Sequence, residues 1–520
     1  MSASPDRSTK RHSPTPGIPV PGGQANTTPP GLLLIQVDGL SAHALEHAVH
    51  SGRMPTVRTM VHEGHRLHAW SSGLPSDTLA VQTSLFWGGK PAAPSFEWWD
   101  RKHQHRRHAA SASGAAAIER TLESEIGPGL LRGGQCHGAA IGGGASGGTL
   151  LPPSGRRTWL SMASESVRAF AHIVARRRRP PSSPPVRQRN EAADPHRAAT
   201  IGRWALAAAV AATSRASGHI VAAAAHRDLE SGRPIIFVNV VEYDLVAHLT
   251  GPRSPRAYDA LASIDALVGT LVRAAREAPR SYRVVVISDH GIAAASPIST
   301  AFAPAMRTWV TNEWARRTRS THRHQLAVFA RGSLLQAWVR DTGERQGLNT
   351  IASRAPGFVE AISRHPAIAL TIAAESTRRD EGSGYLVVGR DGGVRLATRH
   401  RLPPGSEGTR QPPVVVERWG SSPFAGLGPP DEVEAHVAAF AERQDIGDIA
   451  CLAAPTCGLS ETQGDAEFWA FESQYGAHGG IGGDQGRPFV LIPPDDSGPP
   501  DNHGGAPSIH KWLESLAPPR

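Results

Sequence analysis

The chain has 520 residues, with 55 Lys and Arg residues against 46 Asp and Glu residues and a formal net charge of +9. This length suits about two to four domains, or one large α/β domain with insertions. It contains only 3 cysteines, and the longest apolar run in its middle, residues 204–212, is shorter than the roughly 18 residues of a membrane span, which excludes disulfide-rich and transmembrane proteins. The positive charge by itself does not choose between nucleic acid, a membrane surface and an anionic small molecule as the partner.

The N-terminal segment has the composition of a disordered tail. Residues 1–30 are rich in Ser, Pro, Thr, Arg and Gly and contain no apolar stretch long enough for a secretory signal. We therefore expect a disordered tail here, a folded α/β region over residues 31–515 and a cytoplasmic location.

Three short apolar runs are each followed by an aspartate. The runs are residues 31–37, 234–240 and 283–288, and the aspartates are Asp38, Asp244 and Asp289. Apolar runs of this length without alternation are typical of strands buried on both faces of a parallel sheet. A fourth run, residues 488–493, is expected to return the chain to the same sheet.

Helical periodicity separates these runs. Residues 41–52, 56–62 and 258–275 are predicted helices. The last of them places four apolar side chains at helical spacing, Leu261, Ile264, Val268 and Leu271. The alternation of strands and helices predicts a doubly wound, mostly parallel α/β sheet. In such a sheet the carboxyl ends of the strands border the ligand crevice, so we expect the three aspartates at one edge.

Two regions are predicted outside this sheet. A helical insertion over residues 155–230 should contain two Ala/Arg-rich helices, residues 159–176 and 201–226, joined by a Pro/Arg-rich linker over residues 176–199. No aromatic residue is interleaved with the arginines of this linker, so a solvated linker is favoured over specific nucleic-acid binding. Residues 301–450 contain short strand-like pieces and turns, which predict a smaller α+β subdomain.

A set of carboxylate and imidazole side chains is the main chemical signal. It comprises Asp38, Asp244, His248, Asp289, His290 and His478. Asp244 and His248 have the i, i+4 spacing that places two side chains on one face of a helical turn. Such ligands without thiolate suit zinc, iron or manganese, and the set is large enough for two metal sites. Each residue taken singly has an alternative role as a strand-end cap or an ordinary surface histidine.

A hydroxyl group is the candidate nucleophile. The segment Gly73-Leu-Pro-Ser-Asp-Thr78 precedes an apolar helix, which places Thr78 at or near a helix N-terminus, where negative charge is favoured. A hydroxyl bound there by a metal ion can ionise and attack phosphorus. The alternative is that Ser76, Asp77 or Thr78 only caps the helix. We expect Asp77 to point away from the site, because its charge would repel an anionic substrate.

These motifs resemble the alkaline phosphatase superfamily, in particular type I phosphodiesterases/nucleotide pyrophosphatases. The resemblance rests on five blocks in the family's order, and they are Asp38-Gly39, Pro75-Ser-Asp-Thr78, Asp244-Leu-Val-Ala-His248, Ser288-Asp-His-Gly291 and His478-Gly479. It implies a hydrolase domain over residues 31–515 with the alkaline-phosphatase-like α/β fold. It also implies that Asp244, His248 and His478 bind one zinc ion, that Asp38, Asp289 and His290 bind a second, and that Thr78 contacts the second as nucleophile toward a phosphodiester. The substrate would be a phosphate ester or a nucleotide-like small molecule.

The sequence departs from the family pattern after the nucleophile. Leu79-Ala-Val-Gln82 replaces the usual aromatic, Pro, Asn and His residues, and no asparagine occurs between Leu79 and His137 to hold the phosphate. Trp98, Trp99 and Arg101 are the candidate substrate-binding residues, with core packing as the alternative. A phosphomonoesterase, a phosphotransferase and a non-catalytic binding domain remain alternative functions.

Overall fold

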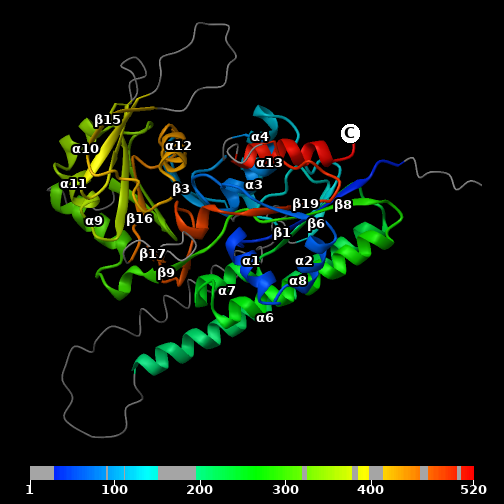
Figure 1. Ribbon diagram of the computed structural model, residues 1–520. Helices are drawn as coiled ribbons and strands as arrows, with labels where there is room; N and C mark the ends of the chain where they lie inside the picture. The colour runs from blue at the N-terminus through cyan, green and yellow to red at the C-terminus, as the bar shows by residue number, and fades with distance from the viewer. Residues whose placement is uncertain are drawn as a thin grey trace, which may run out of the picture.

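The structure is a computed structural model that describes residues 28–89, 92–109, 112–149, 195–318, 325–376, 384–397, 414–456, 467–500 and 505–519. Two seven-stranded sheets organise these residues (Figure 1). Most of the predicted tail, the first predicted helix of the insertion and most of its linker lie outside the described residues.

The main sheet has the strand order β2-β19-β8-β1-β7-β5-β6. Its strands are β1 (Gly31–Val37), β2 (Arg66–Ala69), β5 (Gln135–His137), β6 (Gly147–Thr149), β7 (Ile235–Val240), β8 (Tyr282–Ile287) and β19 (Phe489–Ile492). The five strands β8, β1, β7, β5 and β6 are parallel, whereas β19 is antiparallel to both β8 and β2. All four predicted strands are therefore present, and the parallel order brings the carboxyl ends of β1, β7 and β8 to the same edge.

Helices cover both faces of the main sheet, which confirms the doubly wound fold class. One face is covered by α1 (Ala42–His50), α2 (Pro55–His62), α6 (Pro195–Glu230), α7 (Glu242–Thr250) and α8 (Pro255–Glu277). The other face is covered by α3 (Thr78–Trp87), α4 (Ala112–Glu125) and α13 (Gly505–Leu516). The four apolar side chains predicted on one face of α8 are fully buried.

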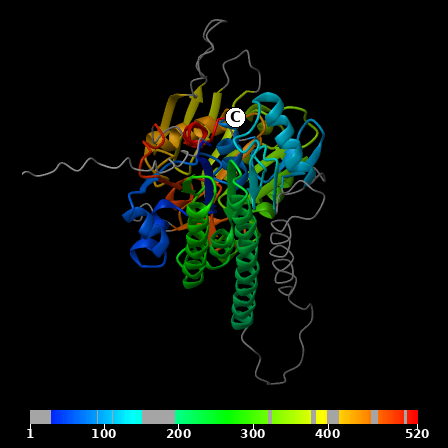
Figure 2. The ribbon, with the colours of Figure 1, turned by 90° about the vertical axis from the view of Figure 1, so that its right-hand side faces the viewer.

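The long helix α6 packs beside α8, and the two run alongside each other in Figure 2. It begins at Pro195, inside the segment predicted as a linker. Among the described helices, none is long and apolar enough to cross a membrane.

The second sheet is antiparallel, with the strand order β10-β11-β16-β12-β13-β14-β15. Its strands are β10 (Leu326–Arg331), β11 (Leu334–Val339), β12 (Ile368–Ala374), β13 (Gly384–Val388), β14 (Gly392–Ala397), β15 (Val414–Gly420) and β16 (Ile449–Ala453). Helix α12 (Pro430–Ala441) covers one face, and α9 (Met306–Arg317), α10 (Leu348–Arg354) and α11 (Phe358–Ser363) cover the other. This sheet occupies most of the segment predicted as a smaller subdomain.

Short elements connect the two sheets. Strands β17 (Glu467–Ala470), β9 (Ala293–Pro297) and β18 (Gly476–Ala477) form a small third sheet, and β3 (Glu97–Asp100) and β4 (His105–His108) form a hairpin. Two short 3-10 turns, Ile298–Thr300 and Gly483–Gly486, follow β9 and β18. Because β18 ends directly before His478, the small sheet positions this histidine at the edge of the main sheet.

Candidate metal centre

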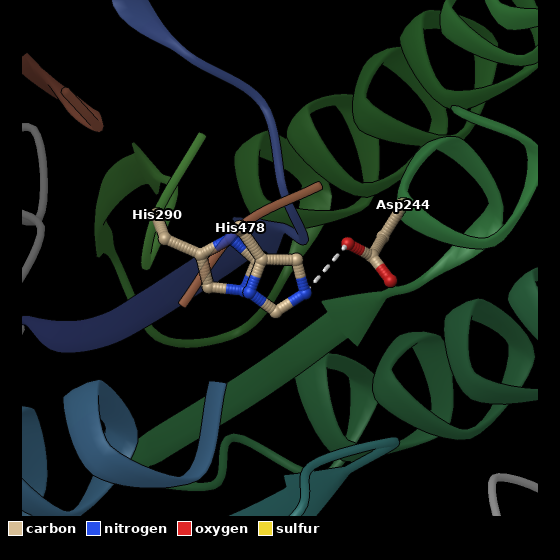
Figure 3. A group of neighbouring side chains, drawn as sticks. All are labelled: Asp244, His290 and His478. Atoms are coloured by element: carbon tan, nitrogen blue, oxygen red, sulfur yellow. Dashed lines mark ion pairs between the residues drawn. The ribbon is translucent and has the colours of Figure 1, made fainter. Parts of the chain in front are cut away.

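The predicted ligands come together at the carboxyl edge of the main sheet. Asp38 and Asp289 follow β1 and β8, and Asp244 lies in the first turn of α7 after β7. The ligand atoms of Asp38, Asp289 and His290 all lie within 4.8 Å of one another, and so do those of Asp244, His290 and His478 (Figure 3). The topology of parallel strands thus gathers side chains that are more than 200 residues apart in the chain.

His290 lies at the centre of this arrangement. Its Nε2 atom is 3.7 Å from Asp38 Oδ1 and 3.6 Å from Asp289 Oδ2. Its ring stacks on that of His478 with 3.9 Å between the centroids, and His478 Nε2 is 3.8 Å from Asp244 Oδ1. His248 completes the row, with Nε2 3.5 Å from Asp244 Oδ2. The family resemblance implies that His248, Asp244 and His478 bind one metal ion together. In the structure, the two groups whose ligand atoms lie closest together both contain His290 instead.

Backbone carbonyls hold all three imidazoles in one orientation. The Nδ1 atoms of His248, His290 and His478 lie 2.7, 3.1 and 2.9 Å from the carbonyl oxygens of Gly476, Gly291 and Ser76. A carbonyl oxygen only accepts hydrogen bonds, so each Nδ1 carries the proton and each Nε2 presents a lone pair. The three lone pairs therefore face carboxylate oxygens, which are also acceptors, and a cation between them satisfies both.

The carboxylates show the same need for a cation. Asp244 Oδ1 and Asp289 Oδ2 are buried and have no hydrogen-bond partner among the described residues. Burial raises the pKa of Asp38 well above its usual value, and the charges of Asp289 and Asp244 raise it further. Burial also raises the pKa of Asp289, with Asp244 adding to the effect.

Burial and the neighbouring histidines His290 and His248 lower the pKa of His478 well below its usual value, which keeps its lone pair available. The donor set fits a divalent metal ion.

The stabilisation of the folded protein by bound metal is expected to increase with pH. Because the raised pKa of Asp38 and Asp289 belongs to the folded metal-free protein, these groups favour folding at low pH and disfavour it as pH rises above about 4. A bound cation displaces their protons, so its affinity rises over the same range. We expect the increase in melting temperature caused by saturating zinc to be larger at about pH 7.5 than at about pH 5. Thermal denaturation with zinc and with chelator measures it, and an increase that shrinks with pH would contradict this account.

Thr78 is the first residue of α3, and its hydroxyl faces the candidate metal ligands Asp38 and His290. Its Oγ1 donates a hydrogen bond to Asp38 Oδ1 at 3.4 Å and lies 3.1 Å from His290 Nε2. Asp77 is the N-cap of the helix, since its carboxylate accepts a hydrogen bond from Ala80 N at 2.8 Å. Asp77 is therefore buried and does not point outward as predicted, because capping α3 turns its side chain inward. This cap leaves the Thr78 hydroxyl available to the site.

A residue that the sequence analysis did not select holds Asp38 in place. Asn239 in β7 is buried beside β1, and its Nδ2 donates a hydrogen bond to Asp38 Oδ2 at 2.8 Å. This bond leaves Asp38 Oδ1 to face Thr78 and His290. A single amide inside the otherwise apolar run of residues 234–240 is a signal that marks this position.

The predicted substrate-binding residues lie in and just after β3. Trp98, Trp99 and Arg101 border a cavity of about 670 Å³ together with parts of the second sheet's loops, residues 343–345 and 444–445. Trp99 is buried under the guanidinium of Arg340, which lies 4.6 Å from the centre of the ring system. None of the candidate metal ligands borders this cavity. A role of these three residues in substrate binding stays a prediction.

Arg101 forms a buried ion pair, and the loss of this pair should lower the stability of the fold. Its Nη2 donates to Asp448 Oδ1 at 2.8 Å, and both side chains are buried. Removing one partner of a buried ion pair leaves an uncompensated charge, so Arg101→Ala is expected to lower the free energy of unfolding by about 3–5 kcal/mol. Denaturant unfolding measures it, with Arg58→Ala at an exposed position of α2 as the control. Unchanged stability with a raised KM would instead assign Arg101 to the substrate.

Comparison with known proteins identifies the family of this chain. Residues 32–400 match the family model of type I phosphodiesterase / nucleotide pyrophosphatase. No curated protein gives a significant sequence match. The chain is similar to two crystal structures of phosphonoacetate hydrolase from Sinorhizobium meliloti 1021. The complex with phosphonoformate has 12% identity and a TM-score of 0.49, and the complex with phosphonoacetate has 13% identity and a TM-score of 0.46. Each match covers 96% of this chain and 99% of the other. Similarity at this level does not transfer a substrate. The family model covers more than half of the chain, which therefore belongs to the type I phosphodiesterase/nucleotide pyrophosphatase family and is a metal-dependent phosphoester hydrolase.

Proposed function

We propose that the protein hydrolyses phosphodiesters with Thr78 as nucleophile and two divalent metal ions, which we take to be zinc. One observation carries the proposal: the Thr78 hydroxyl lies within 3.4 Å of Asp38 Oδ1 and within 3.1 Å of His290 Nε2, at the start of a helix. Ser76, the other hydroxyl of this turn, donates to the carbonyl of Gly480 at 2.7 Å and is not available.

Six side chains would hold the metal ions. Asp38, Asp289 and His290 surround one position, and Asp244 and His478, with His248 beside them, surround the other. Nitrogen and carboxylate ligands without thiolate suit zinc, with manganese or iron as alternatives for the same donor set. When bound, the ions supply Lewis acidity, which stabilises an ionised hydroxyl and the charge that develops on phosphoryl oxygens.

The chain itself supplies the nucleophile and its orientation. Asp38 accepts the hydrogen bond of Thr78 and is in turn held by Asn239, so the hydroxyl oxygen has a fixed direction. The Thr78 hydroxyl releases its proton to solvent as its oxygen attacks phosphorus, and the bond from phosphorus to the leaving oxygen breaks. The leaving alkoxide takes a proton from water and departs as the alcohol. Water then hydrolyses the threonine ester and releases Thr78. The first N–H groups of α3 have no helical partners and favour negative charge at this end.

The direct test is hydrolysis of bis(p-nitrophenyl) phosphate by the zinc-loaded protein, beside the monoester p-nitrophenyl phosphate. We expect diester turnover that chelation abolishes and that added zinc restores. Turnover of the monoester alone would replace the proposal by a phosphomonoesterase, and turnover that survives complete removal of metal would exclude the proposed use of the site.

A further inference from the structure

The turn between β10 and β11 carries the second sheet into contact with the metal centre. Gly332 and Ser333 form this turn, and Ser333 N donates to the carbonyl of His478 at 2.9 Å. A Cβ atom on Gly332 would lie 2.2 Å from the same carbonyl oxygen, so a residue without a side chain is needed here. The close approach fixes Arg331, the last residue of β10, next to His478.

Phe96 and Glu97 hold the guanidinium of Arg331 in place, but no close carboxylate of the described residues neutralises its charge fully. Its Nη2 lies 3.5 Å from Glu97 Oε1, and its Cζ lies 6.0 Å from the centre of the Phe96 ring. Glu97 Oε1 is closer to two other groups, Arg106 Nη2 at 2.7 Å and His108 Nε2 at 3.1 Å. One carboxylate therefore faces up to three cations, and Arg331 is the most distant of them. Within the described chain Arg331 makes no other ion pair, and 29% of its side chain is exposed to solvent.

The charge of Arg331 reaches the residue before the proposed nucleophile. It lowers the pKa of Asp77, the residue before Thr78, although burial raises that pKa overall. The backbone of Arg331 also lies beside the residue after His478, because a Cβ atom on Gly479 would be 3.5 Å from the Arg331 carbonyl oxygen. Glu472, whose Oε2 accepts a hydrogen bond from Gly332 N at 3.2 Å, is the other carboxylate at this turn. Arg331 is thus an accessible cation beside the site, carried by an element outside the main sheet.

We propose that Arg331 binds a second negative charge of the substrate, so that the preferred substrates are phosphoric esters with two negative charges at or beside the phosphorus atom. For the proposed phosphodiesterase, the second charge is an anionic group on one arm of the diester. The additional ionised oxygen of a monoester is the other outcome that the test distinguishes. Both present oxygen anions to a guanidinium, which binds them with charge-assisted hydrogen bonds. This inference rests on the proposed function and names the substrate class of the same site.

The test compares three p-nitrophenyl substrates of the zinc-loaded protein. They are p-nitrophenyl phosphate, a p-nitrophenyl diester whose second arm ends in a carboxylate, and bis(p-nitrophenyl) phosphate, which has a single charge. Arg331→Ala is expected to lower kcat/KM for at least one doubly charged substrate, relative to the singly charged one, by about ten- to a hundredfold. The loss should lie mainly in KM, and Arg331→Lys should recover part of it because the charge remains.

Controls separate a binding role from a structural one. Arg307→Ala removes an exposed arginine of α9 and should leave the substrate ratio unchanged. A loss confined to the monoester places the second charge on the phosphoryl group, and a loss confined to the carboxylate diester places it on the arm. Equal losses with all three substrates would overturn the proposal.

A binding measurement keeps the two proposals distinguishable. Isothermal calorimetry measures binding without turnover. Inorganic phosphate carries its second charge on the phosphoryl oxygens, and 3-phosphonopropionate adds a carboxylate on a short arm. Arg331→Ala should weaken at least one of these ligands about tenfold. If the wild-type protein hydrolyses none of the three substrates, the proposed function fails, whereas unchanged affinity for both ligands refutes the role of Arg331.

Discussion

Replacement of Thr78 by alanine is expected to lower kcat for bis(p-nitrophenyl) phosphate by at least about a thousandfold, because the group that attacks phosphorus is removed while the metal ligands remain. Metal binding should persist, since Thr78 contacts Asp38 and His290 but Asp38 keeps its bond from Asn239. Stopped-flow or steady-state release of p-nitrophenol measures the change, and metal analysis of the same sample shows that the site is loaded.

Two further variants sharpen this experiment. Thr78→Ser keeps a hydroxyl and should retain part of the activity. Thr83→Ser on the same helix is the matched control, because the Thr83 hydroxyl bonds to the carbonyl of Ala80 and not to the metal ligands. Acid quenching followed by mass spectrometry should find a p-nitrophenyl phosphate group esterified to the peptide that contains Thr78, because only one p-nitrophenol leaves in the first step. Thr78→Ala with near-normal kcat would transfer the role of nucleophile to water.

Asp289→Asn is expected to separate metal binding from folding. The amide lacks the charge that a divalent cation needs, so metal affinity at this position should fall by at least about a hundredfold and activity with it. Burial and the charge of Asp244 raise the pKa of Asp289, so an ionised Asp289 is unfavourable without metal. The metal-free variant should therefore melt at the same temperature as the metal-free wild type or higher, whereas the zinc-loaded variant should melt lower than the zinc-loaded wild type.

Metal content by mass spectrometry and thermal denaturation of both forms test this prediction. Asp259→Asn is the control, because Asp259 is exposed and pairs only loosely with Arg53 at 3.4 Å. A variant that still binds two ions per chain would remove Asp289 from the metal site. A metal-free variant that melts well below the metal-free wild type would show that the carboxylate has a structural function instead.

Much of the fold could be predicted because it depends on local patterns. The apolar runs before Asp38 and Asp289 predicted β1 and β8 within a residue of their observed bounds. The spacing of Leu261 and Leu271 predicted the buried face of α8. The family was also predicted from motif order and is confirmed by the family model. Strand and helix periodicities are written in neighbouring residues, so a single chain suffices to find them.

The contacts between side chains could be predicted less well. Asp77, expected to point outward, caps α3 and is buried, because a helix start can be capped by any of three adjacent polar residues and only the backbone path selects one. Arg331 gave no signal, since it is one arginine among many and lies more than 240 residues from Thr78. Its place depends on how a hairpin of the second sheet packs against His478.

The sequence by itself determined which chemistry this protein has available: three aspartates, three histidines and a threonine, each near the end of a strand, in a short turn or in a helical turn. The tertiary structure decided how these groups meet. It places His290 between the two sets of carboxylates, joins Asn239 to Asp38 and brings Arg331 beside the site. Residue types and local periodicity follow from the order of amino acids, whereas these distances follow from the packing of sheets and loops that are hundreds of residues apart in the chain.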